Sequence, residues 1–214
     1  MNITKFGHSC VLIEEEGARI LLDPGTYSEG RQNGVTNLDA LLITHEHADH
    51  IDMASVKALV AGNPGMKIFT NPSVKEILAK DGIESEVLGD GESAEVKGIK
   101  IEGFGHDHAL IHSSIPVCRN TGYFVGGKFF YPGDALTLPN RPVEILGMPT
   151  AAPWARIGEL IDYALAVKPK VAIPMHDAIL ANPSGFHGIF SEILGDAGVE
   201  FRPMEVGVTY TLKT

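Results

Sequence analysis

The sequence predicts an α/β (α+β layered) protein in which two β-sheets pack face to face and helices cover their outer surfaces. Two regions of the chain, one at the N-terminus and one after about residue 82, consist of short segments with strand character. Each region leads into an alternation of strands and helices, which suits this layered arrangement. The 214 residues show no linker, low-complexity segment or close repeat, so we expect one domain over residues 1–214.

The first half predicts an antiparallel meander followed by two strand–helix pairs. The meander has strands at residues 2–6, 9–14 and 18–22, and it ends at the turn sequence Asp23-Pro24-Gly25. The first pair is a strand at 38–43 and a helix at 51–61, where apolar residues recur at helical spacing. The second pair is a strand at 67–70 and a helix from Pro72 to about residue 80, because proline suits an early helical position.

The second half repeats this order. After Gly82 the pattern predicts strands at residues 86–88, 94–96, 99–104, 123–125 and 128–131. The last third then alternates, with a strand at 143–146, a helix at 154–167, a strand at 171–174, a helix at 186–194, and strands near 199–202 and 208–212.

Composition narrows the class of protein and its partners. The 17 basic and 27 acidic residues give a net charge of -10, and no basic stripe follows the chain, so nucleic acid is excluded as an expected partner. The N-terminus lacks the apolar core of a signal peptide, and no apolar run reaches the ~18 residues of a membrane span. We expect a cytoplasmic protein with Cys10 and Cys118 as buried thiols, and a homo-oligomer is compatible with the sequence.

One short segment carries the candidate chemistry: His45, His47, Asp49 and His50 lie within six residues, between a predicted strand and a predicted helix. In an extended chain, residues two apart point the same way, so His45 and His47 can share an ion there. Asp49 and His50 fall where the helix begins and can meet a second ion. Imidazole and carboxylate without thiolate suit zinc and comparable divalent ions. A chance cluster on a solvated loop is the competing interpretation, which the rarity of this spacing disfavours.

These four residues match the His-x-His-x-Asp-His signature of the metallo-β-lactamase superfamily, which the chain resembles over almost its whole length. The resemblance implies a four-layer αββα sandwich and a hydrolase with two divalent ions. It also implies a later Asp and a final His, each after a strand. Tyr131-Pro132-Gly133-Asp134 supplies the Asp, and Met175-His176 supplies the His. Zinc is the expected metal, with manganese, nickel or iron as alternatives.

The remaining histidine ligand has three candidates in Gly105-His106-Asp107-His108-Ala109-Leu110-Ile111-His112. By spacing alone His106 is almost as good as His108. Relatives carry a His-Ala-x-Ile-His element here, and its first member corresponds to His108. The implied ligand set is His45, His47 and His108 for one ion, Asp49, His50 and His176 for the other, and Asp134 as the bridge.

Further features resemble a branch of small hydrolases that includes the ascorbate-6-phosphate lactonase-like proteins. They are the opening Phe6-Gly7-His8-Ser9-Cys10 and the closing Ile173-Pro174-Met175-His176-Asp177. The resemblance places His8 near the metals, against a ligand or the substrate, and His112 is expected to support the site or meet substrate. Asp23 is expected to hold the free ring N–H of a ligand histidine. The loop from Pro149 to Trp154, with Arg156 just beyond it, lies before a helix, and we expect it to form a substrate wall.

The implied activity is hydrolysis of an ester or lactone in a small metabolite. Two ions ~3.5–4 Å apart can share a water, lower its pKa and clamp the oxygens of a carbonyl or phosphoryl group. The resulting bridged hydroxide is the expected nucleophile, and Asp49 is expected to orient it and to carry its proton.

Three other functions remain open from the sequence. Phosphodiester hydrolysis would need cations, for which Lys128, Arg141 and Arg156 are the loop candidates. A metal-binding domain without activity would need no substrate site, and a mononuclear iron oxygenase would use only part of the ligand set.

Overall fold

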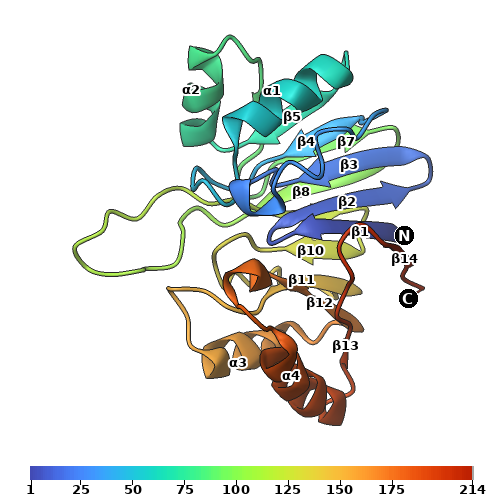
Figure 1. Ribbon diagram of the computed structural model, residues 1–214, viewed down its shortest axis with the longest axis vertical. Helices are drawn as coiled ribbons and strands as arrows, with labels where there is room; N and C mark the ends of the chain where they lie inside the picture. The colour runs from blue at the N-terminus through green and yellow to red at the C-terminus, as the bar shows by residue number, and fades with distance from the viewer. Residues whose placement is uncertain (214) are drawn as a thin grey trace.

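The computed structural model describes residues 1–213 and contains two mixed β-sheets packed face to face, with helices on both outer faces. Figure 1 shows α1 (Met53–Gly62) and α2 (Pro72–Lys80) outside one sheet, and α3 (Ile157–Val167) and α4 (Ser184–Asp196) outside the other. This is the layered α/β fold that the sequence predicts. None of the helices in these residues is long and apolar enough to cross a lipid bilayer.

The first sheet has the strand order β14-β1-β2-β3-β4-β5-β6. Its strands are β1 (Asn2–Gly7), β2 (Cys10–Glu15), β3 (Ala18–Leu22), β4 (Ala40–Leu42), β5 (Lys67–Thr70), β6 (Glu86–Val87) and β14 (Thr209–Thr211). The second sheet has the order β13-β12-β11-β10-β9-β8-β7. Its strands are β7 (Ser93–Val96), β8 (Ile99–Phe104), β9 (Gly122–Val125), β10 (Phe129–Tyr131), β11 (Ile145–Pro149), β12 (Val171–Met175) and β13 (Glu200–Phe201).

The strands that lead into the candidate site run in one direction within each sheet. In the first sheet β1, β3 and β4 are parallel to one another, because β2 is antiparallel to both of its neighbours. In the second sheet β8, β10, β11 and β12 share a direction for the same reason. The carboxyl ends of these strands therefore meet at one edge, and the loops beyond them can combine residues that are far apart in sequence.

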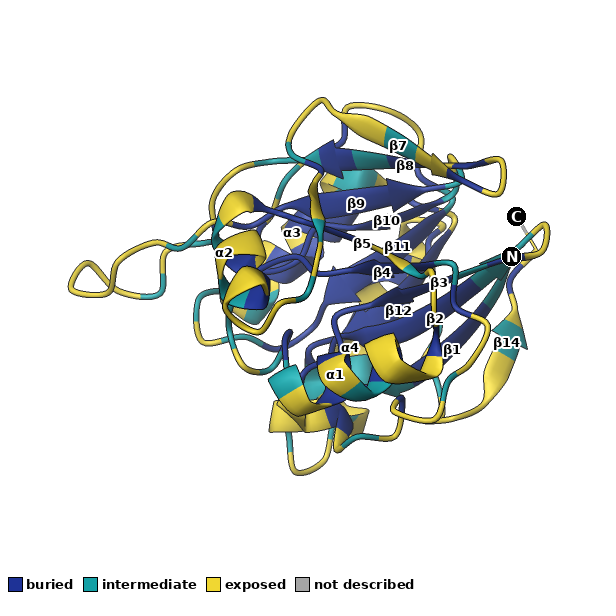
Figure 2. Cartoon of the chain, turned by 90° about the horizontal axis from the view of Figure 1, so that it is seen from above, coloured by how far each residue is buried: buried dark blue, intermediate teal, exposed yellow. Residues whose placement is uncertain are grey.

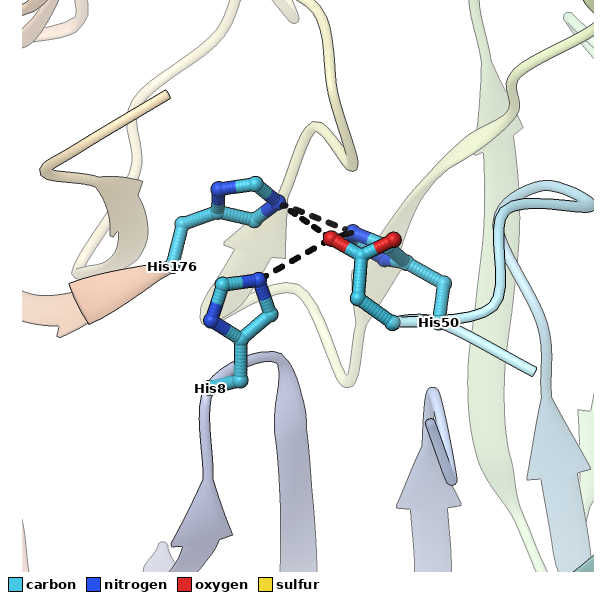
Figure 3. A group of neighbouring side chains, drawn as sticks. His8, His50 and His176 are labelled. Carbon is cyan, nitrogen blue, oxygen red and sulfur yellow. Dashed lines mark hydrogen bonds and ion pairs between the residues drawn. The ribbon is translucent and has the colours of Figure 1, made fainter. Parts of the chain in front are cut away.

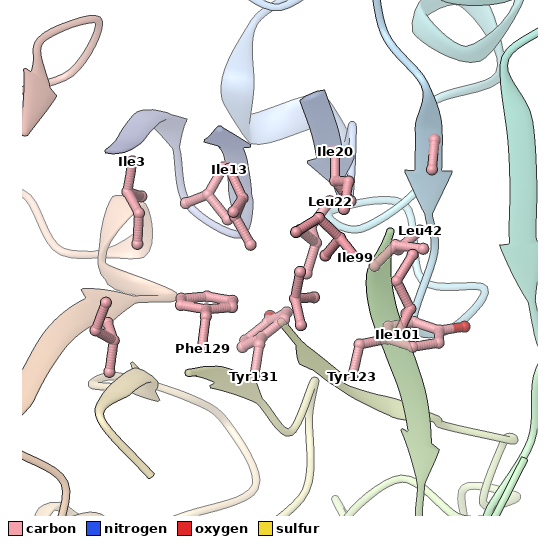
Figure 4. Packing of buried hydrophobic residues seen from close by; sticks show 14 of the residues in the cluster. Ile3, Ile13, Ile20, Leu22, Leu42, Ile99, Ile101, Tyr123, Phe129 and Tyr131 are labelled. Atoms are coloured by element: carbon pink, nitrogen blue, oxygen red, sulfur yellow. The ribbon is translucent and has the colours of Figure 1, made fainter. Parts of the chain in front are cut away.

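A layer of apolar side chains between the sheets holds this edge in place (Figure 4). Strand alternation divides β4 between two layers: Leu42 faces the layer between the sheets, whereas Leu41 packs toward α1 and α2. β12 is divided in the same way, with Ile173 facing inward and Ala172 facing α3 and α4. Figure 2 shows the central strands buried along most of their length, which explains why their sequences are nearly continuous runs of apolar residues.

The structure differs from the sequence prediction mainly at element ends. The strand predicted at 38–43 forms ladder pairs only over Ala40–Leu42. The helix predicted from residue 154 begins at Ile157, because Trp154 turns toward the site and Arg156 is the cap residue. Two short 3₁₀ helices, η1 (Thr26–Ser28) and η2 (Asp177–Ile179), occupy loops in which we expected no helix.

Candidate metal centre

Two adjacent groups of side chains gather at the shared strand edge. The atoms that could bind an ion lie within 4.8 Å of one another in each group. We call them the first cluster, which is His45, His47, His108 and Asp134, and the second cluster, which is His8, Asp49, His50 and His176. The rings of His45 and His50 are 4.0 Å apart between centroids, so the two clusters adjoin.

The loop from β4 to α1 delivers residues to both clusters. His50 and Ile51 donate backbone hydrogen bonds to the carbonyl of His47, which closes the loop into a tight turn. Asp52 then caps α1 by accepting from the amides of Ala54 and Ser55. Gly25 has to be glycine here, because a Cβ at this position would lie 1.8 Å from the Asp49 carbonyl oxygen.

Asp134 follows β10 and touches both clusters. Its Oδ2 lies 3.3 Å from His108 Nε2 and 3.1 Å from His176 Nε2, and its Oδ1 lies 3.2 Å from His50 Nε2. The turn before it depends on Gly133, whose φ is +65° and whose missing Cβ leaves room for the Asn120 side chain. The position is therefore the one at which a carboxylate could join two ions.

The loop from β8 to β9 brings one of the three candidate histidines to the clusters. His108 is buried and belongs to the first cluster, and its amide bonds the Cys118 carbonyl across the base of the loop. The structure does not bring His106 or His112 to either cluster. His106 is 67% exposed and lies 3.4 Å from Asp90, and exposed His112 bonds Ser114. Beyond this base the loop projects away from the sheets (Figure 1).

His8 and His176 pack against each other where β1 and β12 end. Figure 3 shows their rings and that of His50 converging on one carboxylate, which belongs to Asp49. The ring centroids of His8 and His176 are 4.0 Å apart, and the His176 amide donates to the His8 carbonyl. Both residues have positive φ values, 31° and 68°, a backbone conformation that is uncommon outside glycine and concentrates at functional sites.

Buried Lys5 supports the turn that carries His176. Its Nζ donates to the Pro174 carbonyl at 2.6 Å and to the Asp177 carboxylate at 2.5 Å. Asp177 also lies 3.2 Å from His187. Sequence reasoning missed this contact, because a lysine in a strand at the start of the chain is ordinarily read as a solvated residue.

The ring nitrogens that face away from the clusters are held by protein oxygens. His50 Nδ1 lies 2.7 Å from Asp23 Oδ2, His108 Nδ1 lies 2.6 Å from the Ala109 carbonyl, and His176 Nδ1 lies 2.8 Å from the Ala151 carbonyl. His45 Nδ1 lies 3.0 Å from the Thr44 hydroxyl. Each of these rings therefore points Nε2 into its cluster, which is the arrangement that metal-binding histidines use.

The cluster atoms lack enough partners of their own. His108 Nε2, Asp134 Oδ1 and His8 Nδ1 are buried with no hydrogen-bond partner. Within each cluster, pairs of imidazole nitrogens approach to 3.1 Å, as in His45 with His47 and His50 with His176. Unpaired buried polar atoms cost free energy unless something compensates them, and nitrogen and carboxylate donors suit divalent ions. The residues present therefore fit two metal ions.

Charge is distributed unevenly between the clusters. Burial alone would lower the pKa of His50, but the carboxylates of Asp134 and Asp23 outweigh it and raise the pKa well above its usual value. The pKa of His176 rises to about 9, because Asp134 and Asp49 together outweigh burial. Hydrogen bonds from His176 and His8 hold the pKa of Asp49 below its ordinary range against the opposing effect of burial.

Two histidines of the first cluster, His45 and His47, have the opposite tendency. Burial lowers the pKa of His45 well below its usual value, and neighbouring imidazoles add to this effect. The pKa of His47 is lowered for the same two reasons. His8 resembles them although it belongs to the second cluster: burial lowers its pKa to about 4, and its hydrogen bond to Asp49 opposes this only in part. These rings are therefore neutral at pH 7, as metal binding requires.

The structure also places two further predicted site residues and the two cysteines. Trp154 donates its indole N–H to Asp134, so it contacts a cluster residue directly. Arg156 is exposed at the start of α3, and no contact joins it to a cluster among residues 1–213. Cys118, expected to be fully buried, is half-buried with Sγ 3.7 Å from His47 Nε2, and no sequence pattern indicated this contact. Cys10 is buried as expected.

The fold and the paired clusters define a metal-dependent hydrolase of the metallo-β-lactamase type. The sequence model of the family described as the beta-lactamase superfamily domain matches residues 2–176. The chain therefore belongs to the metallo-β-lactamase superfamily.

Relatives agree with this assignment. The chain is 37% identical to protein Rv0786c of Mycobacterium tuberculosis, over 98% of this chain and all of that protein. It is 28% identical to a UPF0173 metal-dependent hydrolase of Aeropyrum pernix, over 91% of this chain and 85% of that one. A metallo hydrolase from the archaeon Ignicoccus hospitalis has the same fold, with a TM-score of 0.72 and 21% identity over 99% of both chains.

Proposed function

We propose that this hydrolase opens a lactone or another small ester, using two divalent ions held by the two clusters. The observation that carries the proposal is Asp134, whose two oxygens face imidazoles of both clusters. When bound, a pair of divalent ions lowers the pKa of water and polarises the carbonyl oxygen under attack. The residues that would hold them are His45, His47 and His108 on one side, Asp49, His50 and His176 on the other, and Asp134 between.

Asp49 is the residue best placed to move a proton. Its side chain is 23% exposed, whereas the other cluster carboxylate, Asp134, is buried, so Asp49 is the carboxylate that water and substrate can reach. Hydrogen bonds from His176 and His8 lower its pKa and keep it ionised at pH 7. A lowered pKa also makes a carboxylate a weaker base, so its part is to orient the attacking water and relay the proton to the leaving oxygen. His8 orients the carboxylate, with Nε2 3.1 Å from Asp49 Oδ2.

The distribution of positive charge favours an uncharged substrate. Of the three cations that could serve a phosphate, Lys128 pairs with Glu15. Arg141 bonds both carboxylate oxygens of Glu102 and lies over the ring of Phe104. Arg156 is exposed two residues after Trp154, but no contact joins it to either cluster among the described residues. A phosphate group generally requires more positive charge than this, so phosphodiester hydrolysis is the second candidate.

The mouth of the site supports the same choice. Tyr27, which is 48% exposed, meets the ring of His8 edge-on at 4.9 Å. In the loop from β8 to β9, Leu110 and Val117 are 58% and 49% exposed. Apolar side chains beside a polar centre fit a small neutral metabolite better than a polyanion. In keeping with the net charge, we propose no nucleic-acid partner.

The test is a substrate panel with matched variants. Purified protein loaded with zinc is assayed against a series of lactones, simple esters and cyclic and linear phosphodiesters. We expect turnover of lactones or esters, and its loss in His45→Ala. The exposed histidine variant His106→Ala is the control and should retain activity. Turnover of phosphodiesters alone would refute the lactonase, and hydrolysis that survives His45→Ala would refute the metal centre as its source.

A further inference from the structure

Trp154 makes a contact that the ligand set does not explain. It is the single tryptophan of the chain, and it lies between β11 and α3, outside both clusters. Its indole N–H donates to Asp134 Oδ2 at 2.8 Å. Its ring meets those of His108 and His176 edge-on, with centroids 6.0 and 6.5 Å apart. The side chain therefore touches the one carboxylate that faces both clusters.

The other neighbours of the Asp134 carboxylate cannot keep it in place once ions are bound. They are the Nε2 atoms of His50, His108 and His176. A ring nitrogen that binds a metal uses its lone pair and no longer donates a hydrogen bond. Among the described residues, the Trp154 N–H is then the only donor that the side chain of Asp134 retains. Oδ1 already lacks a hydrogen-bond partner.

We propose that Trp154 is a positioning residue, which holds Asp134 with Oδ2 between the two clusters and so allows both ions to bind. The inference rests on the proposed two-ion site. Hydrogen-bond partners behind metal ligands commonly contribute 10- to 100-fold to metal affinity. We expect an effect of about this size on the weaker-binding ion, because this ion depends most on a carboxylate shared with its neighbour.

The sharpest test removes the N–H and keeps the shape of the ring. Because the chain has one tryptophan, a tryptophan-requiring host can replace it throughout with β-(benzothien-3-yl)alanine, in which sulfur takes the place of the N–H. Zinc affinities are measured by competition with a chromophoric chelator, and cobalt is bound as a spectroscopic probe. We expect the second equivalent of zinc to bind about 10- to 100-fold more weakly. The cobalt spectrum of the two-ion form should also change.

Two substitutions separate the hydrogen bond from packing. Trp154→Phe keeps an aromatic ring without the N–H and should bind the second zinc ion as weakly as the analogue does. Trp154→Ala should bind it at least as weakly. Unaltered far-ultraviolet circular dichroism and melting temperature in the analogue show that the fold is intact. If the analogue binds both zinc ions as tightly as the natural protein, and only Trp154→Ala loses affinity, Trp154 acts by packing and the proposal is wrong.

The metal titration also separates this proposal from the proposed function. A natural protein that binds two ions but hydrolyses no lactone or ester contradicts the proposed substrate class alone, and the zinc comparison still decides the role of Trp154. A natural protein that binds only one zinc per chain contradicts both. Hydrolysis with unchanged zinc affinity in the analogue contradicts the role of Trp154 alone.

Discussion

The two clusters are built from the same kinds of side chain, yet their charges are set in opposite ways. In the first cluster, burial and neighbouring imidazoles lower the pKa values of His45 and His47. In the second, two carboxylates near each ring raise the pKa values of His50 and His176. The first cluster is therefore ready for a cation at neutral pH, whereas the second holds protons that an ion has to displace.

The difference follows from where the carboxylates lie. His50 has Asp23 at one ring nitrogen and Asp134 at the other, and His176 faces both Asp134 and Asp49. His45 has only a threonine hydroxyl behind it. Two sites of nearly equal ligand content can thus differ in the order and pH dependence of filling. We infer that the first cluster fills first.

Removing one ligand from either cluster should have the largest effect. His47→Ala and His176→Ala should each lower bound zinc from two to one per chain, measured by elemental analysis after gel filtration. Loss of an ion removes several kcal/mol of transition-state stabilisation, so activity should fall by about 1,000-fold or more in both variants. If His176→Ala retains full activity, the second cluster has no part in the reaction and the comparison between the clusters loses its meaning.

The pH dependence of zinc binding should differ between the clusters by at least about 100-fold over two pH units. The pKa of His176 in the metal-free protein is about 9 and that of His50 is also raised, so below pH 9 zinc has to displace at least one proton, and affinity falls at least tenfold for each unit of decreasing pH. Affinity of the first cluster should change by less than about threefold between pH 8 and 6, because the pKa values of His45 and His47 are lowered. Titration calorimetry in two buffers measures both. If zinc affinity depends on pH equally in the two clusters, the proposed difference in their protonation is wrong.

Asp23→Asn tests the carboxylate behind the second cluster. An amide oxygen can still accept from His50 Nδ1 but carries no charge, so zinc affinity of the second cluster should fall by about 10- to 100-fold. The first cluster should be affected less, since Asp23 contacts His50 directly but reaches His45 only through the Thr44 hydroxyl. Asp90→Asn is the matched control, because Asp90 is near His106 and outside both clusters. Equal weakening of both ions would indicate a change in the fold instead.

Much of the site could be predicted because its residues follow strands. His45, Asp134 and His176 each come soon after an apolar run, and strands of one direction end at one edge. The choice of His108 over His106 depended on resemblance, because both follow β8 and differ only in how the loop turns. Membership of His8 in the second cluster depends on packing between β1 and β12, which are in different sheets. A contact between two distant strands leaves no pattern in the local sequence of either one.

The fold was also predictable from local sequence patterns, except where contacts between distant residues decide the structure. Buried strands such as β4 and β12 leave apolar runs in the sequence, and caps such as Asn71 before Pro72 mark where helices start. The start of α3 was not predictable from periodicity. Trp154 and Ile157 are both apolar and suit a helix, but the contact of Trp154 with Asp134 keeps it outside α3. Tertiary contacts decided the boundary.

Cys118→Ala should have the smallest effect and tests how His47 is held. Cys118 Sγ is the only partner at His47 Nε2 among the described residues, whereas His50, His108 and His176 have oxygen at the outward nitrogen. Burial raises the pKa of this thiol to about 11, so it stays neutral at pH 7, and neutral sulfur is a weak acceptor that water can replace at a half-exposed position. We expect zinc affinity of the first cluster to change by less than about threefold, with Cys118→Ser as the control. Loss of one zinc per chain in Cys118→Ala would instead make the thiol a ligand, and the first cluster would then differ from the second in ligand type as well as in charge.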